Sequence, residues 1–98
     1  MALINNENQS IRREILNLLN IDSDSSVNDG ILKTELGLLG LPVDSQRLRE
    51  NLYWLQAQGL VRLETLISSI HIATLTDKGQ DVVENRLIVT GIARARLN

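Results

Sequence analysis

The chain has 98 residues, of which 43% are hydrophobic and 22% charged, and its formal net charge is −2. This length fits a single domain, and the absence of cysteine excludes disulfide bonds, thiolate metal sites and cysteine nucleophiles. Because His71 is the only histidine, we do not expect a histidine-based zinc or catalytic site. No cofactor is expected either. The negative net charge disfavours nonspecific coating of nucleic acid but leaves a specific binder open.

The sequence gives no sign of catalysis, secretion or membrane insertion. The amino-terminal segment lacks the pattern of a signal peptide, and the uncharged stretches are far shorter than a membrane span. Asp22, Asp24 and Asp29 loosely resemble a calcium loop, but the glycine and the closing glutamate of such a loop are missing. We therefore expect a soluble, cytoplasmic domain that is not an enzyme and holds no metal.

Two helices are predicted in the first half of the chain. Residues 6–20 carry apolar side chains on one face, with capping-box spacing at the Asn6 end. Residues 21–28 are polar and interrupt the helix, because serine and aspartate satisfy backbone groups locally. A second helix is expected over 29–39, and Gly40 is a natural residue to end it.

A short connection leads into the third predicted helix. Pro42 disfavours helix in this connection, so a tight turn is expected before Asp44 or Ser45 caps a helix that runs to about Gln58. Leucines recur along this helix with the spacing of a buried stripe. They are Leu48, Leu52 and Leu55.

Alternating segments at 61–65 and 70–74 predict a β-hairpin with its reversal near residues 68–69. Both of these tip residues, Ser68 and Ser69, are uncharged, so the hairpin offers little to grip DNA. His71 alternates with apolar neighbours, and we expect it to be a half-exposed structural histidine, with a pH sensor as the alternative.

The last predicted helix covers residues 77–85. Thr76 caps it, and Gly79 is expected to weaken it. The segment 87–98 is expected to be an extended arm that follows a domain of residues 1–86.

Three helices, a two-stranded hairpin and a further helix define an α+β fold of the winged helix-turn-helix type. A ferredoxin-like fold would need strands before and between the helices. A four-helix bundle would have to absorb the two alternating segments into helices, against their periodicity.

Residues 48–65 and 73–84 resemble winged-helix regulators of the ArsR and MarR type, in a leucine-spaced recognition helix, a Gly-Leu-Val entry into the wing and a Leu-Thr-x-x-Gly segment. The resemblance covers about residues 10–86. It implies the fold, but the ArsR sensing motifs depend on cysteine, so metal sensing is not implied.

A second resemblance is to small winged-helix proteins of Mu-like phages and prophages. It rests on Leu-x-Trp-Leu-x-x-x-Gly-Leu-Val at 52–61 and Ala-Thr-Leu-Thr-x-x-Gly-x-Asp-Val at 73–82. The tail at 89–94 is similar but lacks a proline, and Ala93 stands where a lysine is expected. This resemblance implies a phage or prophage origin rather than a mechanism.

The third helix holds the candidate DNA-binding residues, because a helix-turn-helix inserts the first half of this helix into the major groove. Arginine can bond guanine, glutamine can pair with adenine and serine can hold a phosphate. The candidates on this helix are Ser45, Gln46, Arg47, Arg49 and Tyr53. Because Asp44 and Glu50 offset the two arginines, a solvated or protein-facing surface is the alternative.

Further candidate contacts are Arg62 at the base of the wing and Arg94 and Arg96 in the tail. Trp54 is expected in the core, or else at a dimer interface. Apolar residues near both ends of the chain favour a homodimer, with packing inside one chain as the alternative. They are Leu3, Ile4, Leu87, Ile88 and Val89.

The sequence thus predicts a sequence-specific regulator that binds double-stranded DNA. The alternative is a winged-helix protein–protein interaction module, an adaptor or an inhibitor of a host protein. A continuous positive face that joins the candidate arginines would favour DNA, and a mosaic face would favour a protein partner.

Overall fold

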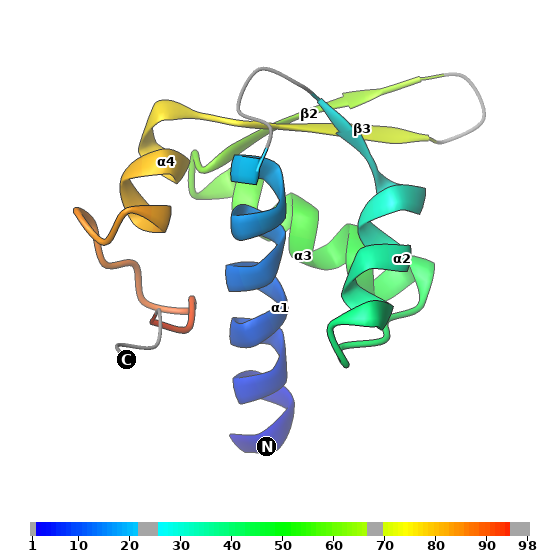
Figure 1. Ribbon diagram of the computed structural model, residues 1–98, viewed down its shortest axis with the longest axis horizontal. Coiled ribbons are helices and arrows are strands. Elements are labelled where there is room, and N and C mark those ends of the chain that lie inside the picture. Colours follow the sequence, from blue (N-terminus) through cyan, green and yellow to red (C-terminus); the bar gives the residue numbers. More distant parts are fainter. Residues whose placement is uncertain (1, 22–25, 67–69, 95–98) are drawn as a thin grey trace.

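The structure is a computed structural model that describes residues 2–21, 26–66 and 70–94 (Figure 1). Within these residues the chain forms helices and strands in an α+β order. The elements are α1 (Ala2–Ile21), β1 (Val27–Asn28), α2 (Asp29–Leu38), α3 (Ser45–Ala57), β2 (Val61–Thr65), β3 (His71–Leu75) and α4 (Asp77–Val83). The predicted α+β class is therefore confirmed.

The sheet is antiparallel and has the strand order β1-β3-β2 among the described residues. Arg62 pairs with Thr74 in the hairpin, and Val27 pairs with Ala73 on the other edge of β3. Strand β1 was not predicted, because its two residues lie in the segment expected to be an irregular polar break. The sheet crosses one end of the helices, so that α1, α2 and α3 lie on the same side of it (Figure 1).

Helix α1 is the central element and is longer than predicted. It begins at Ala2, so the expected cap at Asn6 is wrong and this residue lies inside the helix. Ile11 and Ile15 are fully buried, because α1 is packed against α2, α3, α4 and β3. Among the helices formed by the described residues, none combines the length and the apolar character needed to cross a bilayer.

Helices α2 and α3 begin and end close to the predicted positions. The Asn28 side chain accepts a hydrogen bond from the Ile31 backbone N–H at 2.8 Å, and the Asp44 side chain accepts one from Arg47 N–H at 2.7 Å. Such caps satisfy backbone donors that have no partner within the helix. Gly40 has a φ of +82°, which glycine adopts at little cost, and it reverses the chain after α2.

The core is aliphatic and confirms the leucine stripe predicted for α3. Its members are 0–1% exposed. They are Leu48, Leu52 and Leu55. Trp54, beside this stripe, is partly buried and packs against the core, as predicted, rather than being fully exposed for a dimer interface.

The segment that follows α4 is part of the core, and the prediction of an extended arm is wrong for its described residues. Ile92 is 7% exposed, and Leu87 and Val89 pack against the core as partly buried side chains. The Ala93 N–H donates to the Gln9 carbonyl oxygen at 3.1 Å, which ties the segment to α1. Burial of apolar side chains within the chain thus removes part of the reason for expecting a dimer.

Candidate nucleic-acid interface

Helix α3 has three faces, each with its own surroundings. Residues four and three positions apart share one face of an α-helix. The core face carries Leu48, Leu52 and Leu55. The face beside α1 carries Arg47, Asn51 and Trp54. The outer face carries Gln46, Arg49, Glu50 and Tyr53. The candidate residues of the sequence analysis are therefore divided between two faces.

The outer face of α3 holds most of the predicted contacts. Ser45, Gln46, Glu50 and Tyr53 are exposed, and Arg49 is partly exposed, with its Nε donating to the Ser45 carbonyl oxygen at 3.3 Å. Ser45 and Gln46 form the first turn of the helix. This face thus presents the residue types that can bond bases and phosphates.

Lys33 adds a second positive charge at the start of α3. Its Nζ donates to the Ser45 hydroxyl oxygen at 3.2 Å, and the side chain is exposed. Lys33 was not among the predicted contacts, because only the turn between α2 and α3 brings it to the start of α3. The signal that could have indicated this contact is a lysine on the first helix of a predicted helix-turn-helix, on the side turned toward the second helix.

Arg47 lies on the α1 side of α3 and not on the outer face. Its Nη1 donates to Glu7 Oε1 at 3.0 Å, and its Nε donates to Asn8 Oδ1 at 3.0 Å. The side chain is only 28% exposed. The expectation that Arg47 is a free side chain on the exposed face is therefore wrong, because α1 supplies it with partners.

Polar contacts continue along the boundary between α1 and α3. Asn51 is 2% exposed and donates to the Arg47 carbonyl oxygen at 3.0 Å, while its Oδ1 accepts a hydrogen bond from Arg12 Nε at 2.8 Å. Arg12 also stacks over the Trp54 ring at 4.0 Å and donates to the Gly91 carbonyl oxygen at 3.0 Å. Burial lowers the pKa of the Arg12 guanidinium. We call this chain of contacts the polar seam: Glu7, Asn8, Arg12, Arg47, Asn51 and Gly91.

The far end of the outer face is fixed by His71. The Tyr53 hydroxyl and His71 Nε2 form a hydrogen bond at 2.7 Å, and the two rings meet edge to face. His71 Nδ1 lies 3.5 Å from Asp29 Oδ2 at the start of α2. His71 is 3% exposed, so the expected half-exposed position is wrong: the face of β3 opposite Ile70 and Ile72 is the one covered by helices.

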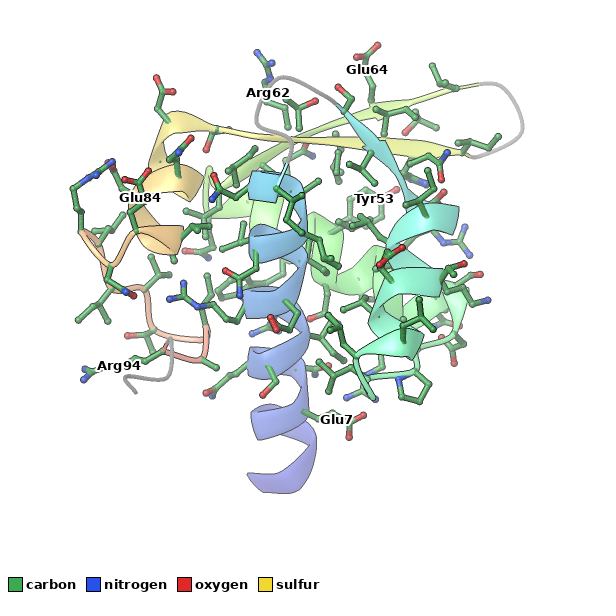
Figure 2. All side chains as sticks on the ribbon, in the orientation of Figure 1. Glu7, Tyr53, Arg62, Glu64, Glu84 and Arg94 are labelled. Atoms are coloured by element: carbon green, nitrogen blue, oxygen red, sulfur yellow. The ribbon has the colours of Figure 1, made fainter. Side chains whose placement is uncertain are left out.

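The other predicted contacts do not gather around α3. Figure 2 shows Arg62 and Glu64 projecting from the side of the sheet away from the helices, and Arg94 at the opposite edge of the molecule. Arg96 and the two serines of the hairpin tip lie outside the described residues. Because Arg47 is paired with Glu7 while Arg62 and Arg94 lie at different edges of the molecule, the described arginines do not form the continuous positive face that would have favoured DNA. By that criterion the charge distribution favours a protein partner, and the case for DNA rests on the outer face of α3 alone.

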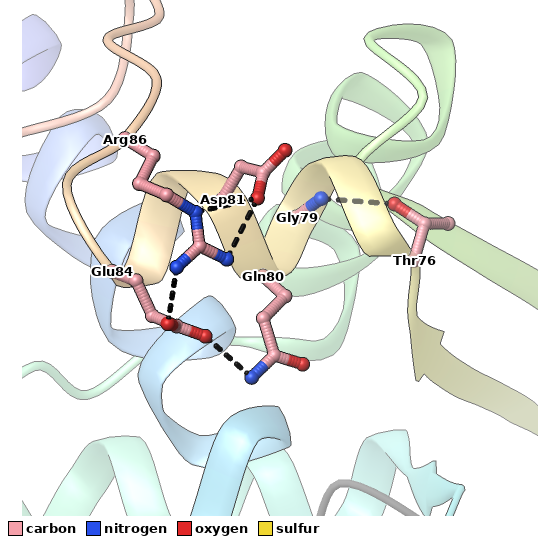
Figure 3. A network of polar contacts seen from close by, with 6 residues as sticks. All are labelled: Thr76, Gly79, Gln80, Asp81, Glu84 and Arg86. Carbon is pink, nitrogen blue, oxygen red and sulfur yellow. Dashed lines mark hydrogen bonds and ion pairs between the residues drawn. The ribbon is translucent and has the colours of Figure 1, made fainter.

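Arg86 is held in an ion-pair network at the end of α4 (Figure 3). Its Nη2 lies 2.9 Å from Asp81 Oδ1, and its Nη1 lies 2.6 Å from Glu84 Oε1. Hydrogen bonds from Gln80 and then Arg86 lower the pKa of the Glu84 carboxyl. Because its guanidinium is paired with two carboxylates, Arg86 adds little free positive charge to the surface.

The described residues thus form a small α+β domain of four helices and a three-stranded antiparallel sheet, an arrangement compatible with a winged helix. The chain is 37% identical over 76 residues to a protein of Escherichia phage Mu that is described as "uncharacterized protein gp26". The match covers 78% of each chain, and the protein belongs to the family of this phage Mu protein. This membership confirms the predicted kinship with Mu-like phages. No protein-family model and no solved structure matches the chain.

Proposed function

We propose that the protein is a sequence-specific DNA-binding regulator of phage or prophage origin, with α2 and α3 as a helix-turn-helix and the β2–β3 hairpin as its wing. The observation that carries the proposal is the outer face of α3, where Gln46 and Arg49 are accessible beside Lys33 and Ser45. Arginine and glutamine read base edges in the major groove, and lysine and serine hold the phosphates beside it. As such a regulator the protein acts in the cytoplasm of the host.

The proposal predicts salt-dependent binding to the DNA that flanks the protein's own gene. In a fluorescence-anisotropy titration, we expect this DNA to bind at least about a thousandfold more tightly than a scrambled duplex of equal length. Affinity should fall steeply between low and moderate salt, because phosphate contacts release counterions. If neither duplex binds at low salt, the protein does not act on DNA.

A protein–protein interaction module is the second candidate, and a different observation favours it. Exposed apolar side chains lie on α2 and near the hairpin, among charges of both signs. They are Ile31, Leu38, Leu39, Leu66 and Ile70. Exposed apolar side chains that gather into a patch mark protein interfaces. A protein that binds no DNA at low salt would make this the better interpretation.

The homodimer also remains a proposal, and it now rests on exposed side chains rather than on the chain ends as a whole. Ile21 is 81% exposed and Ile88 64%. We expect sedimentation equilibrium to give twice the mass of the 10.9 kDa chain. A monomer at tens of micromolar would contradict this and would remove the expectation of a palindromic DNA site.

A further inference from the structure

We propose that Arg47 is a positioning residue that fixes α3 against α1, and that the reading of bases is left to the outer face of α3, chiefly to Gln46 and Arg49. This inference rests on the proposed function, because it assigns roles within the same helix. The inference gives different roles to Arg47 and Arg49, which lie two positions apart and which the sequence presents as equivalent.

The contacts of Arg47 hold it in place from one side. Glu7 and Asn8, to which its side chain is bonded, both belong to α1, and its guanidinium donates one hydrogen bond to each, the one to Glu7 being also an ion pair. To reach a base, Arg47 would have to leave all of these contacts. The Glu7 carboxylate would then lose its partner next to the polyanionic DNA. Within the part of the chain that the structure describes, Arg49 has no such restraint, since the hydrogen bond of its side chain goes to a carbonyl oxygen of its own helix.

The polar seam continues the contacts between α1 and α3 along the length of α3. Asn51 lies one turn beyond Arg47 and is buried, and it joins Arg47 to Arg12. Arg12 in turn holds the Trp54 ring one turn further on. An unbroken row of contacts on one side of α3 sets the rotation of the helix about its own axis.

The far end of the outer face is restrained as well. The Tyr53 hydroxyl is hydrogen-bonded to the buried His71 of β3, so α3 is held toward the sheet as it is toward α1. With α3 restrained in both directions, the exposed Gln46 and the partly exposed Arg49 are carried on a helix of defined orientation. Preorganised contacts of this kind lose less freedom on binding and discriminate more sharply between sequences.

Two matched variants, Arg47→Gln and Arg49→Gln, test the assignment on the same helix. We expect Arg49→Gln to lower affinity for the cognate duplex by roughly ten- to a hundredfold and to relax the preference at one base pair. Arg47→Gln should leave the base preference unchanged at every position. Any loss of affinity that it causes should be equal on all duplexes. A selective loss of preference at one base pair in Arg47→Gln would overturn the inference.

A charge exchange gives the sharper test. Arg47→Glu places two carboxylates together, and we expect it to lose more than about tenfold in DNA affinity as α3 is released. Adding Glu7→Arg restores an ion pair of reversed polarity, and affinity should return to within about threefold of the original protein. If Arg47 reads DNA, the double variant binds as weakly as Arg47→Glu, because a glutamate then faces the duplex.

The outcomes separate this inference from the proposed function. An unmodified protein that binds no DNA overturns both. An unmodified protein that binds, together with a folded double variant that does not recover, overturns the positioning role alone. Circular dichroism establishes that each variant is folded, and the neutral Arg47→Gln variant decides the question if the exchanged pair does not fold.

Discussion

Leu52→Ala is expected to lower the free energy of unfolding by about 2–5 kcal/mol, the range for truncating a buried leucine. Leu52 is fully buried in the centre of the α3 stripe, where the helix meets α1 and the sheet. Removing its side chain leaves a cavity among close-packed aliphatic neighbours that are held by two other elements. Leu55→Ala should have an effect in the same range, since Leu55 is also fully buried. Urea denaturation of each variant measures the loss.

Leu38→Ala is the matched control, because Leu38 is 77% exposed at the end of α2. It should change stability by less than about 0.5 kcal/mol, as is usual for surface substitutions. A loss below about 1 kcal/mol at both Leu52 and Leu55 would mean that the buried face of α3, and with it the outer face, has been assigned wrongly.

Gly79→Ala is the second substitution for which a large effect is expected. Alanine in place of glycine inside a helix ordinarily stabilises it by about 0.5–1 kcal/mol. At Gly79, however, an added Cβ would lie 2.2 Å from the Leu60 carbonyl oxygen and 2.7 Å from Leu75 Cδ1. The Leu60 backbone cannot yield easily, because this carbonyl accepts the Thr76 N–H. We expect a net loss of about 1–3 kcal/mol or more, measured by thermal unfolding.

Gly37→Ala provides the comparison for Gly79. Gly37 is exposed on α2, and a Cβ there meets nothing within 4 Å. The ordinary helix propensity should therefore decide the result, and we expect a gain of about 0.5–1 kcal/mol. Equal gains at both positions would show that α4 does not approach the entry to β2 as closely as the structure has it. From the sequence, Gly79 was expected only to weaken its helix, whereas the close approach of the Leu60 carbonyl gives this glycine a structural role.

Most helices and both strands of the hairpin could be predicted, because their signals are local. The side chains of Asp44 and Thr76 cap helices by accepting hydrogen bonds from backbone N–H groups only three residues further along the chain. The leucines of α3 repeat with the helical period. Strand β1 could not be predicted in this way. Its two residues become a strand only because Ala73 and Ile72 of β3 lie alongside them.

The burial of His71 and of the segment after α4 was decided by neighbours distant in sequence. Alternation correctly separates His71 from Ile70 and Ile72, but it does not tell which of the two sides the helices cover. In the same way, Ile92 is buried in a segment whose neighbouring Ala93 N–H donates to the carbonyl oxygen of Gln9 in α1, a residue far from it in the chain.

The sequence by itself determined which residues of α3 enter the core, because burial of apolar surface follows a period that adjacent residues already display. It did not determine which arginine of α3 is free. Arg47 and Arg49 differ in their partners and not in their type, and the partners of Arg47 are Glu7 and Asn8, forty and thirty-nine positions away. Only the tertiary structure decided this, since an ion pair depends on the distance between two charges in space, and that distance is set by how α1 lies against α3.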